Sequence, residues 1–167
     1  NKGGLLRYAN LVENYPGFPG GIKGKDLVKR FSEQFKREKL KRIQQKVLNV
    51  KYKRDLFEVN TAVNNYSTKF LVIATGTKPK LYNDLKIDPS LSDSVSYGIS
   101  GLQNKKKKHF VIIGAGDLAF DYSLNLGKNN EVTILNHSDT PKCISLLYNR
   151  AKKMKSFTYY KNAVLNQ

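Results

Sequence analysis

The clearest pattern of apolar and polar positions lies in residues 110–135. A compact apolar run at residues 110–113 ends in the turn Gly114-Ala115-Gly116-Asp117-Leu118-Ala119. Apolar side chains at helical spacing continue from there to residue 126, and Gly127 predicts the end of the helix. After a polar turn, residues 131–135 form a second apolar run rich in β-formers. The order of strand, glycine turn, helix and strand predicts a βαβ unit.

The glycine turn has the G-x-G-x-x-A spacing of dinucleotide sites. Gly114 and Gly116 permit a sharp turn and a close approach of a pyrophosphate, and Ala119 lets the helix pack closely on the strand. The spacing alone is weak, because such glycines also occur in βα turns that bind nothing. The strand and helix around it favour a nucleotide site over a purely structural turn. The predicted nucleotide-binding residues are Gly114, Ala115, Gly116, Asp117, Leu118 and Ala119.

The first half of the chain predicts shorter elements. Residues 12–21 are rich in proline, glycine and aromatic side chains and predict a structured loop. An amphipathic helix is expected from Asp26, as its N-cap, to about residue 39. Two β-rich runs follow, and the polar residues 53–55 between them indicate a hairpin.

A second apolar segment, residues 70–74, has no polar alternation and ends in the turn Thr75-Gly76. This pattern predicts a strand buried on both faces of a parallel sheet. Residues 83–93 indicate a connecting loop, with a change of domain between about residues 93 and 105. The chain ends with a predicted helix over residues 144–154 and a strand over 157–160, which together favour an α/β fold.

Composition limits the classes of protein. The chain has 167 residues, of which 40% are apolar, enough for a core. It contains no apolar window as long as a membrane span and no secretory pattern at its start, so we expect a soluble cytoplasmic protein. Cys143 is the single cysteine, which excludes an intramolecular disulfide or a Cys-x-x-Cys pair within this sequence, and the more favoured interpretation is an incidental thiol. No metal ligands are predicted.

The formal net charge of +17 suits a polyanionic partner. The basic residues are spread along the chain, however, and the one dense run, residues 105–108, is more simply a solvated loop. No spacing typical of nucleic-acid-binding motifs accompanies it. Nucleic-acid binding is therefore the less favoured hypothesis, and an acidic protein partner would exploit the same positive field.

Four motifs in register point to a family. They are Gly3-Gly4, the segment Val12 to Pro19, Ala74-Thr75-Gly76 and the unit that begins at Gly114. In this order and at these separations the chain resembles the thioredoxin reductase-like flavoproteins. Residues 116–126 are particularly similar to the branch of ferredoxin–NADP reductases that lacks the cysteine pair.

The resemblance implies two incomplete Rossmann-like three-layer βα domains, a partial FAD-binding domain over residues 1–95 and a partial NAD(P)-binding domain over residues 96–167. It also implies a homodimer in which NAD(P)H passes hydride to FAD and the flavin reduces a protein acceptor, with an acidic ferredoxin-like protein as a candidate. No side chain is assigned a catalytic role. On the FAD side the resemblance implies Gly3, Gly4, Asn14, Val47, Ala74, Thr75 and Gly76.

The departures from the family pattern concern selectivity. Thioredoxin reductases carry Cys-x-x-Cys where this chain has residues 95–101, so the usual disulfide reduction is not expected. The arginine pair that clamps the 2′-phosphate of NADPH is replaced by His137 and Ser138 after Asn136, and the acid that binds the ribose of NAD is missing as well. His137 is a candidate nucleotide contact, although a surface histidine is the simpler interpretation. The nucleotide preference stays open.

The family's first glycine motif and its closing glycine-aspartate segment are missing from these 167 residues. We therefore expect a fragment that binds FAD poorly or not at all. Two alternatives stay open: a non-catalytic relative that keeps the scaffold, and a basic nucleic-acid-binding module.

Overall fold

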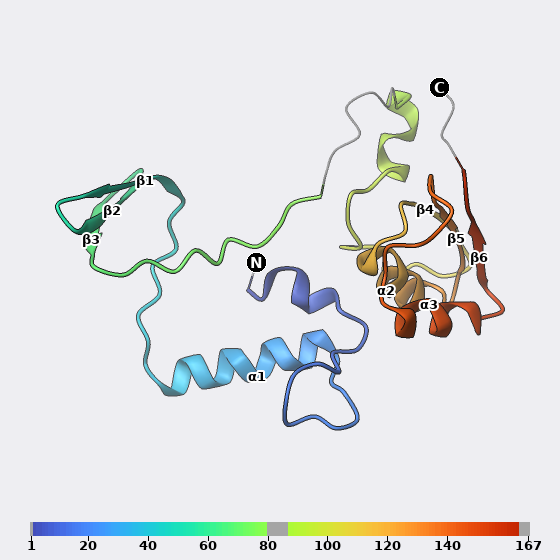
Figure 1. Cartoon of the computed structure of the whole chain (residues 1–167), viewed down its shortest axis with the longest axis horizontal. Coiled ribbons are helices and arrows are strands. Elements are labelled where there is room, and N and C mark those ends of the chain that lie inside the picture. Colours follow the sequence, from blue (N-terminus) through green and yellow to red (C-terminus); the bar gives the residue numbers. More distant parts are fainter. Residues whose placement is uncertain (1, 80–86, 164–167) are drawn as a thin grey trace. The chain divides into compact units, whose positions relative to one another are not determined.

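The structure is a computed structural model that describes residues 2–79 and 87–163. Residues 83–86 of the predicted connecting loop lie outside the described residues. The elements appear in Figure 1, and in chain order they are η1 (Gly4–Tyr8), α1 (Gly24–Arg37), β1 (Val47–Lys53), β2 (Leu56–Thr61), β3 (Asn65–Thr68), η2 (Pro89–Ser94), β4 (His109–Ile113), α2 (Asp117–Leu126), β5 (Glu131–Leu135), α3 (Ser145–Lys152) and β6 (Phe157–Tyr160).

The chain divides into two compact units. The first consists of Asn1–Lys29 and Lys78–Gln167, and the second of Arg30–Thr77, so that the division falls within α1. The predicted boundary between domains at residues 95 and 96 stays a prediction.

The first unit contains a parallel sheet in the order β4-β5-β6. Helix α2 connects β4 to β5 and α3 connects β5 to β6, which gives two consecutive βαβ crossovers. The predicted strands and helices of this region are confirmed, and Gly116 and Gly127 are the N-cap and C-cap residues of α2. The predicted α/β class is confirmed as well.

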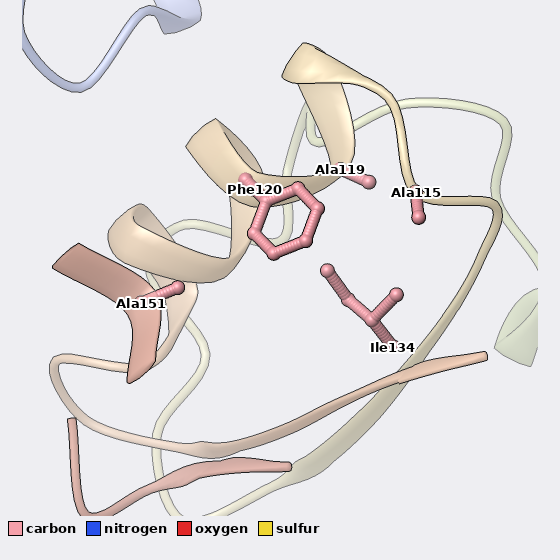
Figure 2. Packing of buried hydrophobic residues seen from close by; sticks show 5 residues of the cluster. All are labelled: Ala115, Ala119, Phe120, Ile134 and Ala151. Carbon is pink, nitrogen blue, oxygen red and sulfur yellow. The ribbon is translucent and has the colours of Figure 1, made fainter. Parts of the chain in front are cut away.

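The core of the first unit lies between α2, α3 and one face of the sheet. Figure 2 shows Phe120 of α2 and Ile134 of β5 pointing toward one another, with Ala151 of α3 beside them. All three side chains are fully buried. Val111 and Ile113 alternate to the opposite face of β4 and are 55% and 44% exposed. The helices thus cover one face of the sheet within the described residues.

The second unit contains the antiparallel meander β1-β2-β3. Lys53 pairs with Leu56, and the two residues between them, Arg54 and Asp55, have φ of 48° and 61°. Positive φ at both central positions is the geometry of a type I′ hairpin turn. The predicted hairpin is confirmed, whereas the sequence pattern missed strand β3.

The prediction of a buried strand at residues 70–74 is wrong in this structure. Phe70, Val72 and Ile73 are 86%, 87% and 77% exposed, and the segment forms no strand. A strand buried on both faces needs neighbouring strands at both edges. No described segment pairs with residues 70–74, so their apolar side chains remain in contact with solvent.

Helix α1 begins earlier than the sequence suggests. Its first residue is Gly24, so Asp26 lies in the first turn and is not the N-cap. The reason is a close contact at the helix start: Gly24 N–H donates to the Ala9 carbonyl, and a methyl group at Gly24 would lie 1.9 Å from the Leu6 carbonyl oxygen. Only glycine permits this approach of η1 to α1.

Candidate functional site

The candidate site lies at the carboxyl end of β4, where the strand passes into α2. Gly114 has φ of 101°, a conformation that favours glycine, and its N–H donates to the Leu135 carbonyl at 2.8 Å. A methyl group at Gly114 would meet no described atom within 4 Å, and one at Gly116 would lie 3.9 Å from the Lys142 carbonyl oxygen. The turn therefore faces open space, which fits the close approach of a pyrophosphate.

The start of α2 suits a bound anion. Gly116 caps the helix without a side-chain hydrogen bond, so no side chain takes the place of a ligand at the first turn. The positive end of the helix dipole lies at this turn, where the Ala119 N–H donates to the Gly116 carbonyl at 3.0 Å. Leu118 lies in this first turn and is 52% exposed.

The two alanines of the motif pack inward. Ala115 and Ala119 are 7% and 9% exposed and belong to the same cluster as Phe120 and Ile134, as Figure 2 shows. Small side chains at these positions let the start of α2 lie close to the sheet. The predicted close packing of the helix at Ala119 is confirmed. The nucleotide contacts of the six motif residues stay a prediction.

A segment from the β5–α3 connection is attached to the turn. Lys142 N–H donates to the Ala115 carbonyl at 2.9 Å, and Ile144 N–H donates to Asp117 Oδ1 at 2.8 Å. The carboxylate of Asp117, which would otherwise repel a phosphate, thus has a donor of its own.

Cys143 lies within this attached segment. Partial burial raises the pKa of the Cys143 thiol, and the carboxylate of Asp117 raises it further. A raised pKa lowers the thiolate fraction, so the thiol is not activated as a nucleophile. The interpretation of Cys143 as an incidental thiol agrees with this environment.

The loop after β5 is organised by Asn136, which is 3% exposed. Its Nδ2 donates to the carbonyls of Ser138 and Thr140, at 2.9 and 3.1 Å, and to the Tyr159 hydroxyl at 2.9 Å. The NH₂ group of Asn136 is therefore occupied by hydrogen bonds within the chain and does not donate to a ribose. His137, the next residue, is exposed, and its proposed contact with the nucleotide stays a prediction.

Asp121 faces the N-terminal segment of the first unit. It accepts the backbone N–H of Asn10 with both oxygens, at 3.1 and 3.3 Å. Burial raises the pKa of the Asp121 carboxyl, while that hydrogen bond and the charge of Lys128 act in the opposite direction. These contacts attach the side chain of Asp121 to the segment around Asn10.

Sequence reasoning missed two contacts that attach residues 8–13 to the βαβ region. One is the Asn10–Asp121 hydrogen bond, and the other is a two-pronged ion pair between Glu13 and Arg150 of α3, with one of its two contacts at 2.9 Å. The partners are 111 and 137 residues apart in the sequence. No local pattern signals such pairs.

The residues expected on the FAD side fall into both units. Gly3, Gly4 and Asn14 belong to the first unit, whereas Val47 and residues 74–76 belong to the second. Gly3 has φ of 81° and packs against Val28 so closely that a methyl group there would lie 2.5 Å from it. Val47 is 51% exposed and residues 74–76 are exposed. The assignment of these residues to an FAD site stays a prediction.

The described residues lack two other kinds of feature. They contain no group of three or more side chains suited to hold a metal ion. None of the described helices has the length and apolar character needed to cross a membrane.

Comparisons with known proteins place the chain in a family. The model of the pyridine nucleotide-disulphide oxidoreductase family matches residues 20–149. The thioredoxin reductase of Borreliella burgdorferi is 28% identical over 96% of this chain and 50% of that protein. The ferredoxin–NADP reductase of Lactobacillus johnsonii is 29% identical over 87% of this chain and 45% of that protein. The chain thus spans about half the length of the curated relatives it matches.

Solved structures support the fold. The thioredoxin reductase of Lactococcus lactis superposes with a TM-score of 0.82 at 22% identity, over 96% of this chain and 54% of that one. The thioredoxin reductase of T. acidophilum gives 0.71 at 24% identity, over 96% and 53%. Thioredoxin reductases and ferredoxin–NADP reductases use FAD and NADPH. The family match and the fold together confirm the resemblance drawn from the four motifs: the chain belongs to the pyridine nucleotide-disulphide oxidoreductase family.

Proposed function

We propose that this chain is part of an FAD-dependent oxidoreductase that takes hydride from NAD(P)H and passes electrons to a protein acceptor. The observation that carries the proposal is the turn at Gly114, where a methyl group would meet no described atom within 4 Å, at the start of α2, whose N-cap Gly116 forms no side-chain hydrogen bond. Membership in the oxidoreductase family supports the same function.

The chain's own residues would position the nucleotide. The glycine turn and the first turn of α2 would hold the pyrophosphate through backbone N–H groups. The attached segment, residues 142–144, would keep the carboxylate of Asp117 bonded to the Ile144 N–H and away from the phosphates. When bound, NAD(P)H supplies the hydride and FAD accepts it.

The proposed electron path does not include a dithiol of this chain. Cys143 is the single cysteine of the sequence, and its raised thiol pKa makes it a poor nucleophile. The proposed acceptor is a separate protein that receives electrons from the flavin. An acidic acceptor of the ferredoxin kind suits the formal net charge of +17.

The FAD site belongs to the proposal for the whole protein. The residues expected on the FAD side lie in two units, and the matched relatives are about twice as long as this chain. The homodimer and the cytoplasmic location are proposals of the same kind, supported by the resemblance to the family.

The proposal is tested on the full-length protein that contains this chain. We expect a yellow protein whose visible flavin absorption bleaches when NADH or NADPH is added without oxygen. Parallel titrations with the two nucleotides determine the preference that the loop at Asn136 leaves open. A colourless protein that ignores both nucleotides would contradict the proposal and favour a non-catalytic relative.

A glycine variant links the function to the turn. Gly114→Ala is expected to weaken nucleotide binding by about tenfold or more, because alanine is strained at this φ and occupies the space of the pyrophosphate. Gly101→Ala is the matched control, since Gly101 also has a left-handed φ, 81°, and open space around it. Equal nucleotide affinities of the two variants would show that the turn is not the site.

A further inference from the structure

A basic groove lies at the end of the parallel sheet opposite the glycine turn. It has a volume of about 580 Å³ and is lined by the start of β4, the α2–β5 turn and Ser156. Lys107, Lys108 and Lys128 line it, and Glu131 is its one acidic residue. Strand β4 has five residues, so the groove and the turn are separated by about 16 Å.

The backbone of the lysine run is held in one conformation by the α2–β5 turn. Asn130 is 7% exposed; its Nδ2 donates to the Lys105 carbonyl at 2.9 Å and its Oδ1 accepts from the Lys108 N–H at 3.0 Å. Lys107 has φ of 55° and donates its N–H to the Asn129 carbonyl at 2.9 Å. Residues 105–108 therefore form a loop with a defined backbone and exposed side chains, in agreement with the predicted solvated loop.

The charges of this loop are available to a partner. Lys107 and Lys108 are exposed, and neither forms an ion pair within the described part of the chain. Lys128 Nζ donates to Asn10 Oδ1 at 2.6 Å, a neutral acceptor, and its charge also acts on the Asp121 carboxylate. The groove thus presents three ammonium groups beside one carboxylate.

The lining favours an acidic protein over a nucleic acid. His109 is the one aromatic ring in the lining, and its Nε2 lies 2.8 Å from the Thr133 hydroxyl, so successive bases have a single small ring on which to stack. The lining has no arginine for bidentate phosphate contacts. The polar groups of Asn130 and Ser156 donate to carbonyls of this chain. What remains for recognition is point charge, which speeds and orients a transient encounter.

We propose that this groove is the docking site for an acidic protein surface, namely that of the electron acceptor. The identity of the partner as an acceptor rests on the proposed function, whereas the docking of an acidic polypeptide does not. Small, charge-guided interfaces are typical of redox encounters. A partner at the amino ends of β4 and β5 would leave the glycine turn accessible to a nucleotide.

The test measures binding of fluorescein-labelled polyglutamate by fluorescence anisotropy at low salt, with no nucleotide present. We expect Lys107→Glu/Lys108→Glu to weaken binding about tenfold, because two attractive charges become repulsive. Lys107→Arg/Lys108→Arg keeps the charges and is expected to bind as the unchanged chain does, which shows that the loop tolerates substitution.

The matched control is Lys41→Glu/Lys46→Glu, two exposed lysines of the second unit. Both glutamate variants change the net charge equally. Equal weakening of polyglutamate binding would show that binding follows the total charge, and it would contradict the groove as the docking site.

Single-stranded RNA is the second probe. RNA that binds more tightly than polyglutamate, and loses this affinity in Lys107→Glu/Lys108→Glu, would overturn the choice of an acidic protein. Neither result depends on flavin or nucleotide binding, so failure here leaves the proposed function standing.

Discussion

At the scale of single residues, Asn136 has a structural role at a position close to that of the ribose-binding acid in other dinucleotide sites. Its side chain donates to two carbonyls and a hydroxyl and shapes the loop after β5. In dinucleotide sites an acid near this position binds the ribose. The absence of the acid can be predicted from the sequence. The hydrogen bonds of the Asn136 amide cannot, because one partner, Tyr159 of β6, is 23 residues away in the sequence.

We predict that Asn136→Asp destabilises the fold and does not create an NAD site. The change removes the amide donors and places a carboxylate against carbonyl oxygens, at a cost of about 3 kcal/mol in the free energy of unfolding. Urea denaturation measures this cost. Asn129→Asp is the control, since Asn129 is exposed, and similar stabilities of the two variants would contradict the role assigned to Asn136.

A second residue, Asp121, makes stability depend on pH. Because burial raises its pKa in the folded state, the folded protein holds the proton more tightly than the unfolded chain. Its contribution is therefore more favourable at low pH and is lost as pH rises through the folded-state pKa. We predict that Asp121→Asn, which keeps an acceptor for the Asn10 N–H, removes this dependence. Urea midpoints of both proteins across the acidic range test it, and unchanged dependence in the variant would refute it.

At the scale of elements, the predictions succeeded where the segments that pack against one another are also neighbours in the sequence. The segment from β4 to β5 was predicted because strand, turn and helix are adjacent in sequence and bury one another. Residues 70–74 were predicted as a strand because they are apolar, yet apolarity does not reveal whether neighbouring strands are present. The start of α1 was misplaced because its cause, a backbone contact with η1, depends on residues 15 or more positions earlier.

That contact gives a prediction for the packing of η1 on α1. Gly24→Ala is expected to lower the free energy of unfolding by about 2–3 kcal/mol, because its methyl group would overlap the Leu6 carbonyl oxygen. Gly20→Ala is the control, since a methyl group at Gly20 meets nothing within 4 Å. Thermal or urea unfolding distinguishes them, and a stable Gly24→Ala protein would rule out the tight contact.

At the scale of the whole molecule, the family and α/β class followed from sequence, whereas the contacts that join distant segments did not. The Glu13–Arg150 and Asn10–Asp121 pairs connect segments more than 100 residues apart. Such pairs depend on the folded arrangement and leave no mark in local spacing. The candidate nucleotide turn was fully located from sequence, and the groove formed by the lysine run was not, because Asn130 fixes it from another element.

The attachment of residues 142–144 to the glycine turn has a consequence for dynamics. Because Lys142 and Ile144 donate their amide hydrogens to Ala115 and Asp117, these hydrogens exchange with solvent only when the segment lifts away. A nucleotide that binds only while residues 142–144 are bonded to the turn would make that opening rarer. At a concentration one hundred times its dissociation constant, exchange at both amides should slow by roughly a hundredfold, while the amides of β2 exchange as before. Hydrogen exchange would thus report ligand binding from residues that need not touch the ligand.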